Sequence, residues 1–300
     1  MRGNAELHQL VAPGSLDEVL SLLAAEPGAW TPIAGGTEIM VAHAAGRLTA
    51  SKLVSLWGIA DLRFIRVGAE SIAIGAGTTF IDMRRHTVLA TELPLLAKAA
   101  AWIGSIANQS RATLGGNLVN GSPAADSSPA LLAYDAEIEM ISVHGSRRIP
   151  YSEFHSGYKR NALAADELLY AVHVPRRFAR HRQYLRKVGT RRAMAIAKVA
   201  LAATALVDYG PGEAAVREIR LGAASLAPYP ARLYRTENVI LGQRIAKNLI
   251  SAARDAILAE AQPIDDIRST AEYRRCVAAN LLEEFLLEVQ QAPDREEPQR

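Results

Sequence analysis

Two segments of this chain share one pattern, an apolar residue followed by Gly-Gly and a small polar residue. They are "AGGTE", residues 34–38, and "LGGNL", residues 114–118. Paired glycines allow successive backbone N–H groups to point into one concavity, where several donors can hold an anionic oxygen. The two segments therefore predict a phosphate or pyrophosphate site. For either segment taken alone, a tight turn without a ligand is the alternative.

Neither glycine segment matches a common nucleotide-binding fingerprint. The chain contains no G-x-G-x-x-G and no G-K-[ST] sequence. "GAGTT", residues 75–79, has only the first two glycines of such a fingerprint, and indicates a turn followed by the N-cap of a helix. Asn120-Gly121 is compatible with a type I′ hairpin turn, but Pro123 disfavours a paired strand directly after it.

The composition is that of a globular enzyme. The chain has 300 residues, 49% hydrophobic and 22% charged, which is enough for two or three domains with buried cores. No apolar run reaches the roughly 20 residues of a membrane span, and the first ten residues lack a signal-peptide pattern, so we expect a cytoplasmic protein. The arginines are dispersed and only 6% of residues are aromatic, which argues against a nucleic-acid partner.

The chemistry-bearing residue types exclude several kinds of site. A single cysteine, Cys276, rules out an internal disulfide and a thiolate-held zinc or iron–sulfur cluster within this chain alone. No H-E-x-x-H and no G-x-S-x-G sequence is present, so a zinc site and a hydrolase nucleophile elbow lack support. Asp126 either caps a helix at Ser127 or binds ligand hydroxyls. Lys187 is either an ordinary lysine in contact with solvent or part of a functional site.

Periodicity and cap residues predict the elements of the N-terminal half. Ser15 and Glu18 indicate a capped helix over residues 15–25. Residues 51–59 and 62–80 suggest strands, with a hairpin near Ala69–Ser71 and a helix that begins at Thr78-Thr79. The remaining predicted elements are a helix over 95–106 and strands over 137–149 and 166–175.

A seam between domains is expected near residues 175–182. After a predicted strand at 183–189, the alanine-rich segment 192–210 is ambiguous, because its alanine content favours a helix whereas its apolar run also fits a buried strand. Two amphipathic helices are predicted over 246–261 and 272–290. The polar residues that follow indicate a disordered tail.

Several longer segments carry a family resemblance. They include "PIAGGTEIM" from Pro32, "IGSIANQSRATLGGNLVNGSPAADSSPALLAYDAEIEM" from Ile103, "FHSGYKRNALAADELLYAVHVP" from Phe154 and "YLRKVGTRRAMAIAKVALAA" from Tyr184. "YPARLYRTENVILGQ" and "IRSTAEYRRCVAANLL" follow in the C-terminal third. Together they resemble the FAD-binding subunit of molybdenum hydroxylases, the group that contains xanthine dehydrogenase and aerobic CO dehydrogenase. The resemblance extends from Leu10 to about Gln290.

The resemblance implies an α+β fold with three parts. A two-subdomain FAD-binding fold of the PCMH type is expected over residues 1–55 and 56–176. A small α+β C-terminal domain, with an antiparallel sheet and helices, is expected over 180–290, followed by a disordered tail at 291–300. The family also has a strand at "AIAKVALAAT", against the helix that alanine content favours.

The resemblance further implies a set of FAD-binding residues. The first glycine segment is expected to hold the pyrophosphate, and the second to lie along the phosphates and the ribityl chain. Asp126 is expected near the sugar hydroxyls of the cofactor, and Lys187 where the isoalloxazine ring is polarised. The implied residues are Ile33, Ala34, Gly35, Gly36, Thr37, Glu38, Ile39, Ile103, Gly104, Thr113, Gly115, Gly116, Asn117, Val119, Ala125, Asp126, Leu168, Leu169 and Lys187.

Two departures from the family pattern concern the surroundings of the flavin. Many relatives have "IRN" just before the second glycine segment, where this chain has "NQS", residues 108–110. The family pattern "GYRKT" is replaced by "GYKRN", so Asn161 stands in place of a threonine.

The function that the resemblance implies is electron transfer within a complex. A large subunit with molybdopterin cofactor oxidises the substrate, a small subunit with 2Fe-2S clusters passes the electrons on, and FAD delivers them to an acceptor such as NAD⁺, oxygen or a quinone. A dimer of heterotrimers is expected. The alternatives are a stand-alone flavin-dependent oxidoreductase of related fold and, from the arginine excess, a non-catalytic binding or assembly protein.

Overall fold

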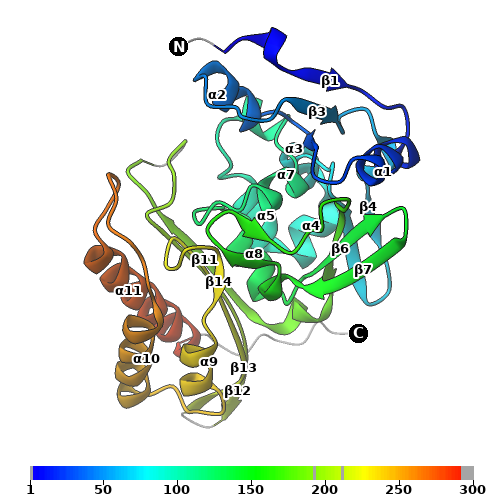
Figure 1. Cartoon of the computed structure of the whole chain (residues 1–300). Helices are drawn as coiled ribbons and strands as arrows, with labels where there is room; N and C mark the ends of the chain where they lie inside the picture. The colour runs from blue at the N-terminus through cyan, green and yellow to red at the C-terminus, as the bar shows by residue number, and fades with distance from the viewer. Residues whose placement is uncertain (1–2, 192–193, 211–212, 292–300) are drawn as a thin grey trace.

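The computed structural model describes residues 3–191, 194–210 and 213–291, and its fold is α+β, which confirms the expected class. Three sheets of three or more strands follow one another along the chain. In Figure 1 they occupy a blue N-terminal part, a cyan and green central part, and a lime to red C-terminal part. Apart from Gln291, the expected tail lies outside the described residues.

The N-terminal part is a small parallel sheet with one long helix. Its strand order is β1-β3-β2, from β1 (Gln9–Val11), β3 (Lys52–Ser55) and β2 (Trp30–Ile33). Helix α1 (Leu16–Ala25) begins as predicted, because the Ser15 hydroxyl accepts a hydrogen bond from the Glu18 backbone N–H at 3.2 Å. The remaining elements are η1 (Ala5–Leu7), α2 (Ile39–Ala44) and η2 (Ala60–Leu62).

The central part is a five-stranded antiparallel sheet packed against short helices. The strand order is β4-β5-β10-β6-β7, and the predicted hairpin near residues 69–71 joins the first two strands. The strands are β4 (Ile65–Val67), β5 (Ser71–Gly75), β10 (Leu168–Pro175), β6 (Glu137–Ser142) and β7 (Gly145–Pro150). The helices are α3 (Phe80–Arg85), α4 (Thr87–Glu92), α5 (Pro94–Ala100), α6 (Ile106–Gln109), α7 (Leu114–Val119) and α8 (Ser128–Ala133).

One helix prediction for the central part needs correction, and another is confirmed. The helix expected over 95–106 is interrupted, because the chain turns after α5 through Gly104 at φ 47° before α6 begins. The helix after Thr78-Thr79 is confirmed, with Thr79 as the N-cap of α3. The smaller elements here are η3 (Tyr151–Glu153), the hairpin of β8 (His155–Gly157) and β9 (Arg160–Asn161), and η4 (Arg177–Arg180).

The C-terminal part is an antiparallel sheet in the order β11-β12-β13-β14 with helices on one face. The strands are β11 (Arg182–Val188), β12 (Val199–Gly210), β13 (Glu213–Ala224) and β14 (Ala231–Arg232). Helices α9 (Tyr234–Ile240), α10 (Lys247–Glu260) and α11 (Ala271–Gln290) follow, and the last two confirm the amphipathic predictions. Figure 1 shows α10 and α11 side by side along this sheet.

The alanine-rich segment contains strand β12, so the helix that its composition favours is wrong. Its side chains face two cores in alternation. Ala202 packs into the core of the central part, whereas Leu201 and Ala203 pack into the core of the C-terminal part. Because both faces of β12 are covered, no polar face marks a two-residue period in the sequence. The strand expected from the resemblance is therefore confirmed.

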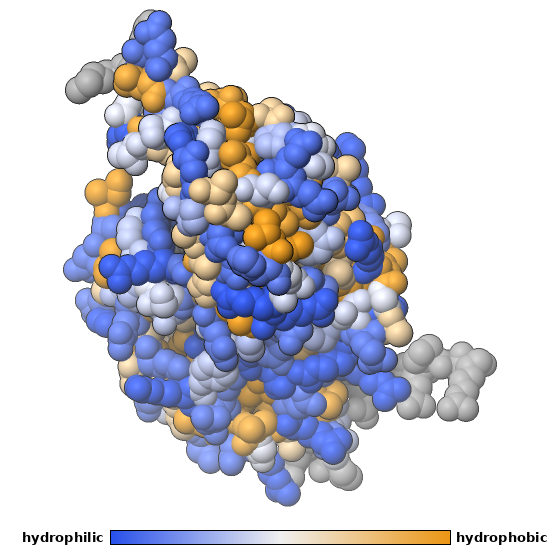
Figure 2. Space-filling view, turned by 45° about the vertical axis from the view of Figure 1, so that its right-hand side comes forward, coloured by the Kyte–Doolittle hydropathy of each residue, from blue (hydrophilic) through white to orange (hydrophobic). Residues whose placement is uncertain are grey.

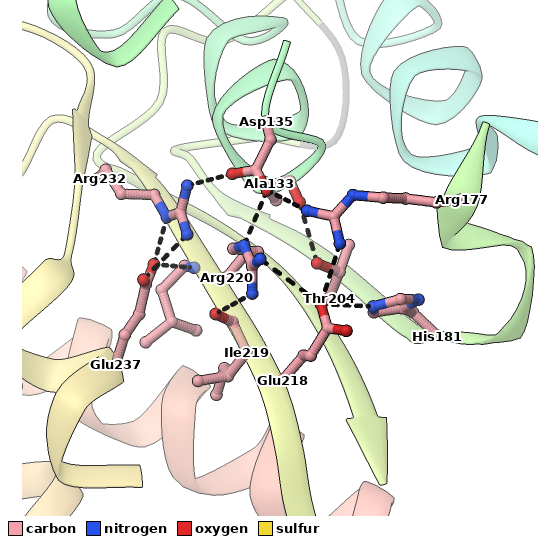
Figure 3. Close-up of polar contacts among 11 residues, drawn as sticks. Ala133, Asp135, Arg177, His181, Thr204, Glu218, Ile219, Arg220, Arg232 and Glu237 are labelled. Atoms are coloured by element: carbon pink, nitrogen blue, oxygen red, sulfur yellow. Dashed lines mark hydrogen bonds and ion pairs between the residues drawn. The ribbon is translucent and has the colours of Figure 1, made fainter. Parts of the chain in front are cut away.

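A cluster of ion pairs joins the central part to the C-terminal sheet. Asp135 follows α8 at φ 48° and accepts hydrogen bonds from three guanidinium groups. Figure 3 shows these arginines reaching Asp135 from different elements. Burial acts to raise the pKa of Asp135, but Arg232 and Arg220 outweigh it and hold that pKa below its usual value. The other members are Arg177, Glu218 and Glu237.

The surface is mostly hydrophilic on the face seen in Figure 2, with hydrophobic side chains in separate patches. Across residues 3–191, 194–210 and 213–291, no helix is both long enough and apolar enough to cross a bilayer.

Candidate functional site

The first glycine segment forms a turn between β2 and α2. Each of its two glycines is required for a different physical reason. Gly36 has φ 75°, a conformation that favours glycine. A Cβ on Gly35 would lie 1.7 Å from the Arg111 carbonyl oxygen, so only glycine allows this close approach. Within the part of the chain that the structure describes, the backbone N–H groups of residues 35–38 have no protein acceptor. The turn thus offers the cluster of free donors that an anion needs.

The second glycine segment is helix α7 rather than a loop, which corrects the sequence prediction. The Thr113 hydroxyl caps it and accepts from the Gly116 N–H at 3.1 Å, while the Leu114 and Gly115 N–H groups donate to carbonyls of Thr78 and Ala76. These amides are therefore already satisfied, and the expected nest of free donors is wrong for this segment. A Cβ on Gly115 would lie 2.6 Å from the Ala76 Cβ, so chain packing explains this glycine.

A cation–π pair lies beside the contact between Gly35 and Arg111. The Arg111 guanidinium carbon is 3.7 Å from the centre of the Trp57 ring. Trp57 follows β3, whereas Arg111 precedes α7 and touches the first glycine turn through its carbonyl. The stack therefore helps to hold the N-terminal and central parts together at the site. The sequence carries no signal for this pairing, because the residues lie 54 positions apart in the chain.

The turn that carries Ile103 and Gly104 is held by a buried glutamine. The Gln109 side chain accepts from Arg84 at 2.5 Å and donates to the Ala101 carbonyl at 3.1 Å. Gln109 belongs to the "NQS" departure, and it is 3% exposed. The departure therefore supplies an amide that bridges α3 and the turn after α5.

Asp126 and Lys187, which the sequence places 61 residues apart, form an ion pair at 2.6 Å. Their side chains are 11% and 10% exposed, and Lys187 also donates to the Trp102 carbonyl at 3.5 Å. Asp126 makes no cap on α8, so the helix-cap alternative is wrong. Its other oxygen, Oδ1, is buried and has no partner among the described residues. Burial raises the pKa of Asp126 to about 6, although Lys187 opposes this shift.

The raised pKa of Asp126 predicts a pH-dependent contribution to stability in the cofactor-free protein. Between pH 3.8 and about 6 the folded chain binds more protons at this carboxyl than the unfolded chain does, so stability falls as pH rises. We expect the unfolding free energy of the wild type, minus that of Asp126→Asn, to fall by up to about 3 kcal/mol from pH 4 to pH 7. Denaturant titrations at both pH values measure this difference, and a constant difference would contradict the assignment.

Other residues that the sequence predicted for the site lie around α7 or bond to its neighbours. The Ser127 hydroxyl donates to Asn117 Oδ1 at 2.6 Å, which ties the segment of Asp126 to α7. Asn161, the second departure, donates to the Val119 carbonyl at 3.2 Å and so places the β8–β9 hairpin beside α7. From that hairpin Lys159 forms an ion pair with Glu38 at 3.8 Å.

Three predicted residues have their side chains in the protein interior. Ala125 is 4% exposed, and Leu168 and Leu169 are 3% and 4% exposed on the central strand β10. Leu168 packs in the N-terminal core and Leu169 in the central core. Their side chains thus hold the two cores together behind the site, whereas the first glycine turn and the Asp126–Lys187 pair present polar groups.

Comparison with known proteins decides the family. The sequence profile described as the FAD binding domain in molybdopterin dehydrogenase matches residues 5–177, and the profile of the CO dehydrogenase flavoprotein C-terminal domain matches residues 184–289. The chain belongs to the FAD-binding subunits of the molybdopterin dehydrogenases. The suspected resemblance is therefore confirmed, together with FAD as the cofactor and an oxidoreductase function within a heteromeric molybdenum hydroxylase.

Relatives of this FAD-binding subunit are similar over most of their length. The xanthine dehydrogenase FAD-binding subunit of Escherichia coli O157:H7 is 30% identical over 87% of this chain and 88% of its own. The carbon monoxide dehydrogenase medium chain of Hydrogenophaga pseudoflava is 28% identical over 92% and 94%. A solved structure of carbon monoxide dehydrogenase from the same organism superimposes with a TM-score of 0.87 at 26% identity, covering 94% of this chain and 96% of that one.

Proposed function

We propose that FAD lies along the line of segments from the first glycine turn to the Asp126–Lys187 pair. The free backbone N–H groups of residues 35–38 carry this proposal, because they are donors suited to a pyrophosphate. The surface of α7 at Gly116, Asn117 and Val119 then flanks the middle of the cofactor. The ring end would lie toward Lys187 and the turn at Ile103-Gly104, and the buried side chains of Ala125, Leu168 and Leu169 would support the site from behind.

In this arrangement the chain's residues bind and orient the cofactor. When bound, FAD supplies the capacity to accept two electrons and to release them to an acceptor. The glycine turn would bind the phosphates, the Trp57–Arg111 stack holds the segment that this turn contacts, and the Asp126–Lys187 pair would set the charge beside the ring. Domain boundaries near residues 55 and 176–180 are part of the same proposal.

The proposed place of the chain is within a molybdenum hydroxylase complex with large and small subunits. We infer that molybdopterin cofactor sits in the large subunit and 2Fe-2S clusters in the small one, since the single cysteine of this chain cannot hold such clusters. A dimer of heterotrimers, an external acceptor such as NAD⁺, oxygen or a quinone, and a cytoplasmic location complete the proposal.

The cofactor assignment predicts that the chain, expressed alone and mixed with FAD, retains about one FAD per chain after desalting. The free N–H groups of the first glycine turn provide the binding energy through charge-assisted hydrogen bonds. Flavin absorbance of the desalted protein measures the retention. Colourless protein would contradict the proposal.

Affinity purification of the tagged chain from its native host tests the proposed partners. Two further chains with molybdenum and iron should co-purify in fixed ratio. Steady substrate turnover by the isolated flavoprotein would instead favour the stand-alone oxidoreductase.

A further inference from the structure

We propose that Asp126 and Lys187 act on FAD as one charge-balanced unit, in which Asp126 masks the ammonium of Lys187 and keeps the reduction potential of bound FAD low. The inference rests on the proposed position of FAD. It deepens that function by assigning a role to the pairing of two residues, beyond their separate contacts with the cofactor.

The geometry of the pair couples the two residues electrostatically. The family resemblance implies that Asp126 lies near the sugar hydroxyls and Lys187 at the ring, and the structure places their charged atoms 2.6 Å apart. Two groups this close face the same portion of an extended dinucleotide. Each side chain is about nine-tenths buried, so solvent does not separate their fields.

Further contacts hold each of the two residues of the pair in place. Lys187 lies on the edge strand β11, opposite Ala200 of β12, and its ammonium also contacts the Trp102 carbonyl. Asp126 lies in the segment before α8, where the neighbouring Ser127 is bonded to Asn117 of α7. Neither group therefore needs to reorient when a cofactor binds beside α7.

The charges of the pair decide its effect on the flavin. Reduction adds negative charge to the ring, and an isolated ammonium nearby would favour the reduced cofactor. A carboxylate at 2.6 Å from that ammonium cancels most of its field at longer range, so the pair contributes little to the potential. The second carboxylate oxygen, Oδ1, is buried without a protein partner and is free to accept a hydrogen bond from the cofactor.

The test is the midpoint potential of FAD in the reconstituted full chain at pH 8, where Asp126 is ionised. Asp126→Asn leaves Lys187 unmasked, and we expect reduced FAD to bind at least about tenfold more tightly relative to oxidised FAD, a rise of about 30 mV for two electrons. The double variant Asp126→Asn with Lys187→Gln should return toward the wild-type potential. An unchanged or lower potential in Asp126→Asn, or a double variant as high as the single one, overturns the inference.

The matched control is Glu284→Gln. It removes the carboxylate of the exposed Arg186–Glu284 ion pair. Arg186 is the neighbour of Lys187 on β11, and the side chain of Arg186 points to the opposite face of the strand. Its potential should equal that of the wild type, and a rise equal to that of Asp126→Asn would contradict a local effect. Wild-type protein that retains no FAD would refute the proposed function rather than the pairing.

A second variant keeps the inference testable if Asp126→Asn does not retain FAD. Lys187→Gln removes the ammonium that opposes the burial shift, so the pKa of Asp126 rises further and its carboxyl is held closer to the neutral form. We expect a potential equal to or lower than that of the wild type, and a potential above the wild-type value would count against the pairing.

Discussion

Arg232→Met is expected to lower the free energy of unfolding by about 3–5 kcal/mol. The Arg232 side chain is 8% exposed and binds both Asp135 and Glu237, and the Glu237 side chain is itself 8% exposed. Removing the guanidinium leaves the Glu237 carboxylate buried, with the hydrogen bond that it accepts from the Leu221 N–H. Burial already raises the pKa of Glu237 even with Arg232 present, which shows how costly its charge is.

Equilibrium denaturant unfolding measures this loss, and two variants control it. Arg217→Met removes an exposed pair with Asp208, whose side chains are 63% and 60% exposed, and should cost no more than about 1 kcal/mol. Arg232→Met combined with Glu237→Gln should recover part of the stability, because the uncompensated charge is gone. A double variant less stable than the single one would show that packing, and not charge, dominates.

Gly35→Ala is expected to weaken FAD binding by at least about tenfold. The added Cβ would lie 1.7 Å from the Arg111 carbonyl oxygen, so the glycine turn must move away from the segment that precedes α7. Because phosphate binding depends on several N–H groups pointing at one position, a displaced turn loses more than one hydrogen bond, each worth about 1.5–3 kcal/mol to a charged group. Fluorescence titration with FAD gives the dissociation constant.

Gly58→Ala is the matched control for this experiment. A Cβ at Gly58 would meet no atom within 4 Å, and this residue follows Trp57 in the same part of the molecule. Its FAD affinity should match the wild type. Equal affinity in Gly35→Ala would show that the turn binds no phosphate in its present position.

Local sequence patterns predicted those elements whose determinants lie within a few residues. The Ser15 cap, the hairpin around residues 69–71 and the last two amphipathic helices are examples, since cap residues, turn residues and periodicity act at short range. Alanine content was misleading for β12, because a strand covered on both faces has no alternating polar pattern.

The candidate site likewise has features that the sequence predicts and features that depend on tertiary packing. Sequence pattern indicated the two glycine segments and the family resemblance indicated Asp126 and Lys187, but neither revealed which glycines are required by the packing of the chain itself. Gly115 is required by its packing against Ala76, and only Gly36 has the backbone conformation that favours glycine in the first turn.

By itself the sequence determined the α+β class and the family, and it supplied the residues proposed for the FAD site, because these depend on residue types and their order. The tertiary structure alone decided that Asp126 pairs with Lys187, that Arg111 contacts Gly35 and that Arg232 joins the central and C-terminal parts. Such contacts form between distant segments, and their strength depends on burial and on distances of a few ångströms. Both quantities come into existence only when the chain is packed.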